Sequence, residues 1–294
     1  MKKGILLAGG FGTRLYPNTS VVNKHLLNIY SKPMIYYSLS TLMLAGLREI
    51  LIISSPEDKK NYKSLLGDGE DFGIKIFYET QVVPRGIAES ILIAENFLEK
   101  DDFALILGDN LFYSESLTLI LKECIKNLRG ATILAYHVKN PEDYGIVEFN
   151  DKKEVKRIVE KPKKPRSNFA VTGLYFYKNI AVSYAKKIKP SNRGELEITA
   201  LNNLFLKNKG LDLEILGRGV AWLDTGSFEG LLEANNFVYS IEKRQSLLIN
   251  CPEEIAYRKN WINKSILRKK AKKNKNSPYG KYLERILKEK LYYL

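Results

Sequence analysis

The feature that most constrains the fold is an alternation of short apolar runs with amphipathic stretches over the first two-thirds of the chain. It predicts strands at residues 4–7, 49–54, 74–79 and 104–107. It predicts helices at residues 34–45, 61–66 and 87–98. Continuous apolar strands separated by helices are typical of a parallel sheet covered on both faces. We therefore expect a doubly wound α/β fold with its ligand at the carboxyl ends of the strands.

Beyond residue 130 the spacing changes. Strands are expected in close succession at 131–138, 145–149, 155–159 and 172–177, as in an antiparallel or mixed extension of the sheet. Helices at 195–207 and 228–242 and strands at 213–216 and 220–223 follow. Ser227 is the expected N-cap of the second helix. From Pro252 onward the chain is expected to be helical but less apolar, so we expect a core at 1–242 and a helical appendage at 243–294.

No membrane-spanning segment is expected, because the longest apolar run, near residues 34–47, is interrupted by Tyr, Ser and Thr. The apolar stretch at 5–8 is too short for the core of a signal peptide. We therefore expect a cytoplasmic location. Cys124, Cys251, His25 and His137 are each isolated, without a partner at metal-ligand spacing, so neither a disulfide nor a zinc site is expected.

The net charge is +14, from 47 basic and 33 acidic residues. Such an excess favours anionic partners, which include nucleic acid, an acidic membrane face and phosphorylated small molecules, and composition does not choose among them. The chain is also rich in Lys, Asn and Ile, as an AT-rich genome would produce, so part of the excess requires no functional explanation. The basic run at 268–275 is most simply a solvated helix face or loop.

A glycine-rich segment follows the first strand directly: Leu-Ala-Gly-Gly-Phe-Gly-Thr-Arg-Leu, residues 7–15. Its glycines allow positive φ and a close approach of backbone amides to an anion. It is not a P-loop, because no Gly-Lys-Ser/Thr ends it, and it lacks the third glycine and the downstream acid of a dinucleotide fingerprint. Arg14 lies in the segment and Lys24 follows ten residues later. Two cations beside a glycine loop suit a triphosphate, whereas the alternative is a tight turn with surface cations.

Together with Lys24 and Lys-Pro-Met-Ile-Tyr-Tyr at 32–37, this segment resembles the sugar nucleotidyltransferases, specifically the glucose-1-phosphate thymidylyltransferase family. Further matching segments are Leu-Gly-Asp-Gly (66–69), Leu-Gly-Asp-Asn (107–110), Glu-Lys-Pro (160–162), Ala-Val-Thr-Gly-Leu-Tyr (170–175), Arg-Gly-Glu-Leu-Glu-Ile-Thr (193–199), Trp-Leu-Asp-Thr-Gly (222–226) and Pro-Glu-Glu-Ile-Ala (252–256). The resemblance covers nearly the whole chain.

The resemblance implies a Rossmann-like α/β fold: a mixed, mostly parallel sheet with helices on both faces, a sugar-binding insertion in the core and a helical C-terminal appendage. It implies transfer of a deoxythymidylyl group from dTTP to glucose 1-phosphate with release of pyrophosphate, dependent on Mg²⁺. Catalytic roles are implied for Arg14, Lys24 and Lys161. The implied ligand contacts are Gly9, Gly10, Thr13, Gln81 and Gly86 for the nucleotide, Asn110, Tyr144, Gly145, Glu160 and Thr172 for the sugar, and Asp109 and Asp224 for the metal.

Several of these roles also have a physical basis in the sequence. Asp109 follows an apolar strand at the expected ligand edge of the sheet. Because Mg²⁺ takes one or two carboxylates plus phosphate oxygens, Asp109 requires a distant partner, and Asp224 after a short strand is the natural candidate. In Glu160-Lys161 an acceptor for sugar hydroxyls adjoins a cation for the sugar phosphate. The alternatives are a turn at Asp109, a helix-entry acid at Asp224 and a charged strand edge at Glu160.

Related enzymes are homotetramers with a second nucleotide site at a subunit interface, where the end product of the pathway inhibits. The resemblance assigns candidate positions for such a site to Tyr113, Ser114, Arg218, Arg244, Glu254 and Ile255.

Three other readings remain open from the sequence. The first is the same chemistry with another base or sugar, since thymine and uracil share the edge that Gln81 would read. The second is a nucleic-acid binder that uses the Lys-rich tail and the run 161–166, although no recognisable nucleic-acid module is present. The third is a degenerate homologue, against which the intact Arg14, Lys24 and Asp109 argue. We expect no nucleic-acid partner.

Overall fold

A computed structural model describes residues 1–10 and 12–289. Its centre is a parallel array of the four strands that were predicted in the first part of the chain. β1 (Lys3–Ala8) lies between β4 (Glu49–Ser54) and β6 (Phe103–Leu107), and β5 (Lys75–Thr80) lies outside β4. β1, β4 and β6 are apolar and buried along most of their length, as the sequence predicted for a sheet covered on both faces, whereas β5 at the edge is largely accessible.

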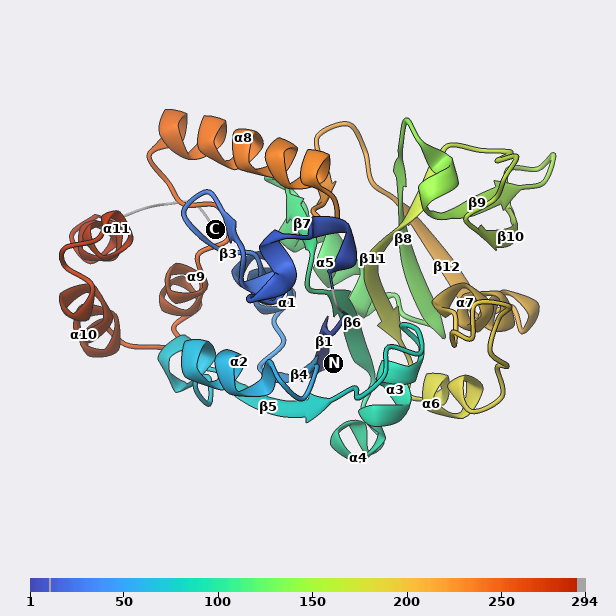
Figure 1. The fold of residues 1–294 in the computed structure, drawn as a ribbon, viewed down its shortest axis with the longest axis horizontal. Helices are drawn as coiled ribbons and strands as arrows, with labels where there is room; N and C mark the ends of the chain where they lie inside the picture. Colours follow the sequence, from blue (N-terminus) through green and yellow to red (C-terminus); the bar gives the residue numbers. More distant parts are fainter. Residues whose placement is uncertain (11, 290–294) are drawn as a thin grey trace.

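The mixed extension of the sheet is also confirmed. β11 (Phe169–Tyr177) runs antiparallel beside β6 and pairs in the same sense with β8 (Ala131–His137) and β9 (Gly145–Phe149). β10 (Val155–Glu160) extends the sheet antiparallel to β9, and β12 (Leu211–Ile215) lies parallel to β8. The described part of the main sheet has nine strands, and β9 and β10 project from one end of the molecule (Figure 1).

The expected strand at 220–223 does not join this sheet. It forms β13 (Ala221–Asp224), which pairs antiparallel with β7 (Asn110–Tyr113), a strand that the sequence reading missed. A second small ladder joins β2 (Asn28–Ile29) to β3 (Lys32–Pro33). The β7–β13 ladder links the end of the parallel array to the segment that precedes the long helix α8 (Phe228–Gln245).

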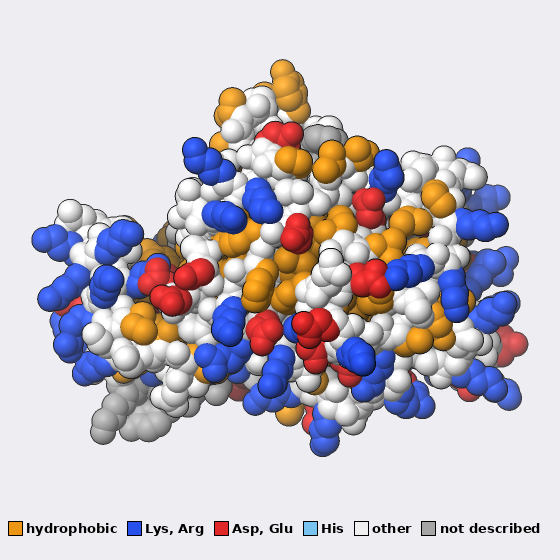
Figure 2. All heavy atoms as spheres, turned by 90° about the horizontal axis from the view of Figure 1, so that it is seen from below, with side chains coloured by type: hydrophobic (Ala, Val, Ile, Leu, Met, Phe, Trp, Pro, Cys, Tyr) orange, Lys and Arg blue, Asp and Glu red, His pale blue; other side chains and the backbone are white. Residues whose placement is uncertain are grey.

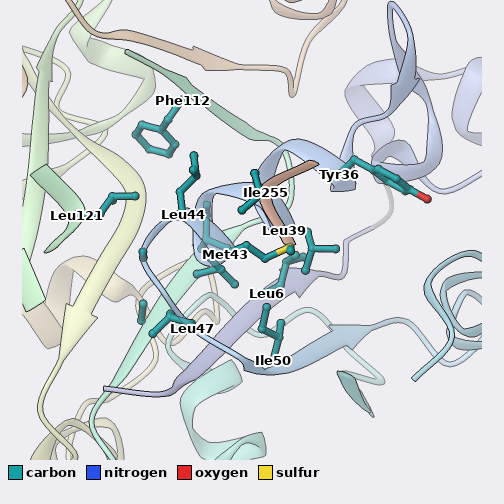
Figure 3. Packing of buried hydrophobic residues seen from close by; sticks show 14 of the residues in the cluster. Leu6, Tyr36, Leu39, Met43, Leu44, Leu47, Ile50, Phe112, Leu121 and Ile255 are labelled. Atoms are coloured by element: carbon teal, nitrogen blue, oxygen red, sulfur yellow. The ribbon is translucent and has the colours of Figure 1, made fainter. Parts of the chain in front are cut away.

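Two apolar layers cover the two faces of the sheet. On one face Leu6, Ile50 and Ile52 pack in a cluster with α1 (Ile35–Leu44), whose Leu39 and Met43 point toward the sheet (Figure 3). On the other face the alternate strand residues Ile5, Leu51 and Ile53 pack with α3 (Glu89–Ile93) and α6 (Ile180–Ala185). The alternation of side chains along each strand thus fixes helices on both faces, as predicted.

The remaining helices largely follow expectation. α2 (Lys59–Leu66), α7 (Ile198–Lys207) and α8 occur where helices were predicted, and Ser227 caps α8 by accepting the Gly230 N–H at 3.1 Å. The expected helix at 87–98 is instead two short helices, α3 and α4 (Glu95–Leu98), which meet at Ala94. α5 (Leu117–Lys126) was missed, although Leu117, Leu121 and Cys124 line its buried face.

The C-terminal segment is helical, as expected: α9 (Pro252–Arg258), α10 (Lys264–Lys273) and α11 (Pro278–Ile286). Ile255, Leu267 and Leu283 are buried in the same cluster as α1, while α10 and α11 lie at one end of the molecule (Figure 1). The expected boundary at residue 242 falls inside α8. The division into core and appendage stays a prediction, and residues 290–294 lie outside the described part.

The positive charge is spread over the face seen in Figure 2. Lys and Arg side chains lie from one end of the molecule to the other, with Asp and Glu side chains among them. The basic run at 268–275 lies mostly on α10, where Lys270 pairs with Asp71 at 2.6 Å. Among the described helices none has the length and apolarity to cross a bilayer.

Candidate active site

The glycine loop follows the carboxyl end of β1. Gly10 and Gly12 have φ of 99° and 59°, in the left-handed region that favours glycine. A Cβ on Gly12 would lie only 2.9 Å from Thr19 Cγ2. Thr13 and Arg14 begin the turn that follows (Thr13–Leu15), and the Arg14 side chain is exposed. The loop therefore presents backbone and a guanidinium at the expected ligand edge.

Lys24 and Asp109 form an ion pair across this edge, between Nζ and Oδ2. Asp109 follows β6 and is 8% exposed. Burial by itself would raise the pKa of the Asp109 carboxyl, but Lys24 and the side-chain amide of Asn110 outweigh burial and hold that pKa well below its usual range. Asp109 is therefore ionised, and Lys24, which was expected at the triphosphate, pairs with this carboxylate.

Asp224 lies opposite Asn110 in the β7–β13 ladder, which brings it beside Asp109. Burial raises the pKa of the Asp224 carboxyl, and the negative charge of Asp109 raises it further. Thr225 fixes the backbone between them, because both its N–H (3.0 Å) and its hydroxyl (2.8 Å) donate to the carbonyl oxygen of Asp109. The two carboxylates predicted to bind metal are therefore held together by the fold.

Arg14 and Tyr144 complete the surroundings of Asp224. A Cβ on Gly226 would lie 2.8 Å from Arg14 Nη2 and 3.0 Å from Asp224 Oδ1, so the guanidinium and the carboxylate both lie against this glycine. The pKa of Tyr144 is raised to about 12, by burial first and then by the charge of Asp224. Its ring packs edge-on against Trp222, with centroids 5.3 Å apart.

The residues expected at the base lie beside the start of the glycine loop. A Cβ on Gly9 would lie 3.2 Å from Gln81 Oε1, so the Gln81 amide lies directly beside the loop. Its Nε2 donates to Glu89 at 2.7 Å and to the Gly86 carbonyl at 3.3 Å. Gly86 has φ of 100°, and a Cβ there would lie 2.5 Å from Leu196 O. Gly86 is thus required by close backbone packing in addition to any contact with a base.

Three of the residues expected at the sugar, Glu160, Gly145 and Tyr144, lie together at the end of β10. Glu160 Oε2 accepts a hydrogen bond from Thr199 Oγ1 at 2.5 Å, and a Cβ on Gly145 would lie 3.3 Å from Glu160 Oε2. Lys161 follows with φ of 42°, and its N–H donates to Tyr144 O at 3.0 Å. The side chain of Lys161 is exposed. Its positive φ is strained for a non-glycine residue, as often found at functional sites.

Thr172 and Asn110 differ in how their polar groups are satisfied. Thr172 is fully buried, and its Oγ1 has no hydrogen-bond partner among the described residues. Asn110 is 3% exposed, and its amide bonds to Asp109, Gly173 and Trp222. The sugar contact expected of Thr172 stays a prediction, and the Asn110 amide is engaged within the protein.

The sequence reading did not assign several residues that hold this site together. Thr199 binds Glu160, Thr225 binds Asp109 and Glu89 orients Gln81. Thr199 and Thr225 both lie in segments that carry the resemblance, so the signal was in the sequence. Their partners are distant along the chain, and only the folded structure identifies them.

The candidate regulatory residues lie outside this cluster. Tyr113 OH donates to Gln245 Oε1 at 3.5 Å near the end of α8, while Glu254 accepts a hydrogen bond from Tyr282. Ile255 is 3% exposed and belongs to the core. Of the other candidates, Ser114 contacts Ser116 at 3.0 Å, and Arg218 and Arg244 are exposed.

The donor set at Asp109 and Asp224 suits a magnesium ion that is shared with a phosphorylated ligand. Two carboxylates lie together in a buried setting, where mutual repulsion raises the pKa of one of them. No cluster of three or more His, Cys, Asp or Glu side chains suited to a metal occurs within residues 1–10 and 12–289. A site with two carboxylates leaves the other coordination positions to phosphate oxygens and water, as Mg²⁺ prefers.

Comparisons with known proteins agree with this arrangement. The model of the nucleotidyl transferase family matches residues 3–241. A glucose-1-phosphate thymidylyltransferase from Neisseria meningitidis is 53% identical over 287 residues, which span 98% of this chain and 100% of the relative.

Two solved structures are also similar. A Bacillus anthracis protein, described as a candidate glucose-1-phosphate thymidylyltransferase and crystallised with sucrose, superposes with a TM-score of 0.74 at 39% identity. That match covers 81% of this chain and 95% of the relative. A UDP-glucose pyrophosphorylase complexed with UDP-glucose gives a TM-score of 0.71 at 27% identity, over 82% and 99% of the two chains. From the site and these relatives together, the chain belongs to the nucleotidyl transferase family, in the group of glucose-1-phosphate thymidylyltransferases.

Proposed function

We propose that this chain transfers the deoxythymidylyl group of dTTP to glucose 1-phosphate, giving dTDP-glucose and pyrophosphate. The observation that carries the proposal is the convergence of Asp109 and Asp224 with Lys24 and Arg14 beside the glycine loop. Paired carboxylates and paired cations at the carboxyl edge of a parallel sheet suit a triphosphate that arrives with a divalent metal.

The chain's own residues account for an in-line displacement. An oxygen of the sugar phosphate attacks the α-phosphorus of dTTP, and the bond from that phosphorus to the bridging oxygen breaks as pyrophosphate leaves. Lys161 holds and orients the sugar phosphate, while Arg14 and Lys24 stabilise the charge on the leaving pyrophosphate. No covalent enzyme intermediate is required.

Asp109 and Asp224 would hold Mg²⁺, which supplies charge neutralisation at the phosphate oxygens when bound. Glu160, Gly145, Tyr144 and Thr172 would form the sugar pocket. In that pocket Glu160 accepts hydrogen bonds from sugar hydroxyls, and the otherwise unpartnered hydroxyl of Thr172 gains a polar contact.

The runner-up is the same reaction with UTP. It is favoured by the likeness to a UDP-glucose pyrophosphorylase, and Gln81 would read the edge that thymine and uracil share. The first experiment is therefore pyrophosphate release with Mg²⁺ and glucose 1-phosphate, comparing dTTP with UTP, CTP, ATP and GTP. We expect dTTP to be turned over preferentially. Equal turnover of UTP would retain the mechanism and change the substrate, and no release from a folded protein would refute the proposal.

We further propose a homotetramer in the cytoplasm with a second nucleotide site at a subunit interface. The candidate residues of this site are Tyr113, Ser114, Arg218, Arg244, Glu254 and Ile255. The proposal is supported by the two exposed arginines, which are suited to a diphosphate, and by the proximity of Tyr113 to the end of α8.

A further inference from the structure

Trp222 donates a hydrogen bond to Asn110, and the positions of the two residues in the β7–β13 ladder explain this contact. Trp222 is two residues before Asp224 on β13 and therefore lies on the same face as Asp224 and its partner Asn110. A diagonal neighbour across a ladder lies within reach of a large aromatic side chain. The indole Nε1–H of Trp222 accordingly donates to Asn110 Oδ1 at 2.6 Å.

The same Asn110 side chain also binds Asp109. Its Oδ1 also accepts the backbone N–H of Gly173 at 2.9 Å, and its Nδ2 donates to Asp109 Oδ1 at 3.0 Å. The fit is close, because a Cβ on Gly173 would lie 2.6 Å from Asn110 Oδ1. All three contacts are shielded from water, because Asn110 and Trp222 are 3% and 7% exposed.

The two N–H groups fix which way the amide faces. With Oδ1 toward Trp222 and Gly173, both donors are satisfied and Nδ2 faces the carboxylate. The flipped amide would direct its NH₂ group at two N–H donors and its oxygen at the ionised Asp109, so all three contacts would be lost. The N–H of Gly173 belongs to the backbone, and Trp222 is the donor that a substitution can remove.

We propose that Trp222 is a positioning residue for the metal site, acting through the Asn110 amide on the Asp109 carboxylate. Asp109 Oδ2 faces Lys24 and Oδ1 is held by Asn110, so the rotation of the carboxylate is set by these two contacts. The inference rests on the proposed function, in which Asp109 holds Mg²⁺. It gives Asn110 a role in supporting the metal site, in addition to the sugar contact that the resemblance implies.

The test compares three single variants by their affinity for Mn²⁺. Trp222→Phe keeps a ring but removes the N–H, whereas Trp222→His keeps a ring N–H at the equivalent position of the five-membered ring. Trp261→Phe is the matched control, because Trp261 packs beside Arg48 in the C-terminal part of the fold. Mn²⁺ binding to dTTP-saturated protein, without sugar phosphate, is measured by electron paramagnetic resonance.

We expect Trp222→Phe to raise the Mn²⁺ dissociation constant about three- to tenfold, the range of a single net hydrogen bond. Trp222→His should bind Mn²⁺ more tightly than Trp222→Phe, although it loses more aromatic surface. Trp261→Phe should match the unmodified protein. If Trp222→His binds Mn²⁺ no more tightly than Trp222→Phe, the affinity follows the size of the ring and not the N–H. Trp222 then has only a packing role, and the inference is overturned.

A double-mutant cycle separates action through Asn110 from a direct effect. In an Asn110→Ala background, Trp222→Phe should change Mn²⁺ affinity little, because the connecting amide is gone. An undiminished effect in that background would overturn the inference. Turnover of the unmodified protein with dTTP and glucose 1-phosphate is measured in parallel. Its absence would refute the proposed function, whereas normal turnover with unchanged Mn²⁺ affinity in Trp222→Phe would refute only the positioning role.

Discussion

Asp224 lies directly opposite Asn110 in the antiparallel β7–β13 ladder, and this pairing brings the Asp224 carboxylate beside that of Asp109. The strand β7 starts immediately after the end of the parallel array, whereas β13 starts after the whole antiparallel extension. Two acidic side chains from distant parts of the chain thus share one site because of backbone pairing. The ladder is therefore a structural requirement of the candidate metal site.

We expect Arg14→Ala to reduce turnover on the order of 10²-fold, because one charged contact to the departing pyrophosphate is lost. Arg14 is exposed, so stability should change by less than about 0.5 kcal/mol. Steady-state pyrophosphate release and thermal unfolding measure the two effects. Arg166→Ala, another exposed arginine, is the control. Near-normal turnover of Arg14→Ala would contradict the role given to this side chain.

Lys161→Ala should raise the KM for glucose 1-phosphate much more than the KM for dTTP, because Lys161 is assigned to the sugar phosphate. The substitution removes an exposed charge and leaves the hydrogen bond from its N–H to Tyr144 O intact. Initial rates with each substrate varied in turn test this, with Lys163→Ala as the exposed neighbouring control. A larger effect on the KM for dTTP would place Lys161 on the nucleotide.

Asp224→Asn should abolish most turnover and yet stabilise the protein in EDTA at pH 8. Burial and then Asp109 raise the pKa of Asp224 above its unfolded value, so its stabilising contribution is present at low pH and is lost as pH rises through the folded pKa. Asn removes the charge and keeps an oxygen for the Gly226 N–H, which now donates at 2.9 Å. The melting temperature should rise by about 2–4 °C for each kcal/mol of stability gained when the charge of Asp224 is removed.

The Asp224→Asn gain should shrink toward pH 4, where the carboxyl is protonated in the folded state and about half protonated in the unfolded state. Differential scanning fluorimetry at both pH values measures it, and the exposed Asp143→Asn serves as the control. A melting temperature lower than that of the unmodified protein at pH 8 would show that the repulsion between the two carboxylates is not significant.

His25 should make the fold sensitive to acid. Burial, with the charge of Lys24, lowers the pKa of His25 to about 3, so the neutral ring is the folded form. Its stabilising contribution is complete above the unfolded pKa near 6.5 and is lost as pH falls toward 3, by up to about 1.4 kcal/mol per pH unit. Chemical unfolding measures the free energy of unfolding at pH 7 and at pH 5. Between these pH values it should fall less for His25→Asn than for the unmodified protein. His137→Asn, at an exposed position, should leave the loss unchanged.

The proposed regulatory site predicts inhibition by dTDP-rhamnose at a place distinct from the active site. Arg244→Ala should weaken this inhibition with little effect on turnover in its absence, because Arg244 is exposed and lies outside the candidate active site. Inhibition curves at saturating dTTP measure the effect, and Lys243→Ala is the matched control on the same helix turn. Purely competitive inhibition that Arg244→Ala leaves unchanged would refute the second site.

Much of the fold was predictable because its strands have strong local patterns. The expected strands at 49–54 and 145–149 agree with β4 and β9 at both ends, since each is a mostly apolar run with turn or polar residues around it. β7 has only four residues, and only a two-residue turn at Gly108 and Asp109 separates it from β6, so its sequence does not mark it as a separate strand. Its pairing with β13 depends on tertiary structure, and no period in the sequence encodes it.

The candidate site likewise contains residues that local sequence patterns identify and residues that only the tertiary structure identifies. The cations Arg14 and Lys24 were found from their spacing after a glycine loop, and Asp109 from its place at a strand end. The support given by Thr225 and Trp222 was not found, because a hydroxyl just after a strand, or an indole within one, is usually part of the core. Only the distances from Thr225 to Asp109 and from Trp222 to Asn110 distinguish support of the site from ordinary packing.

The late position of β13 in the chain has a consequence during synthesis. A nascent polypeptide can complete the parallel array, with its glycine loop and Lys24, once β6 has left the ribosome. The partner carboxylate arrives only after the antiparallel strands and α7 have been made. Fragments released before residue 224 would therefore carry the loop and Asp109 without the second acid, and premature termination would yield inactive chains.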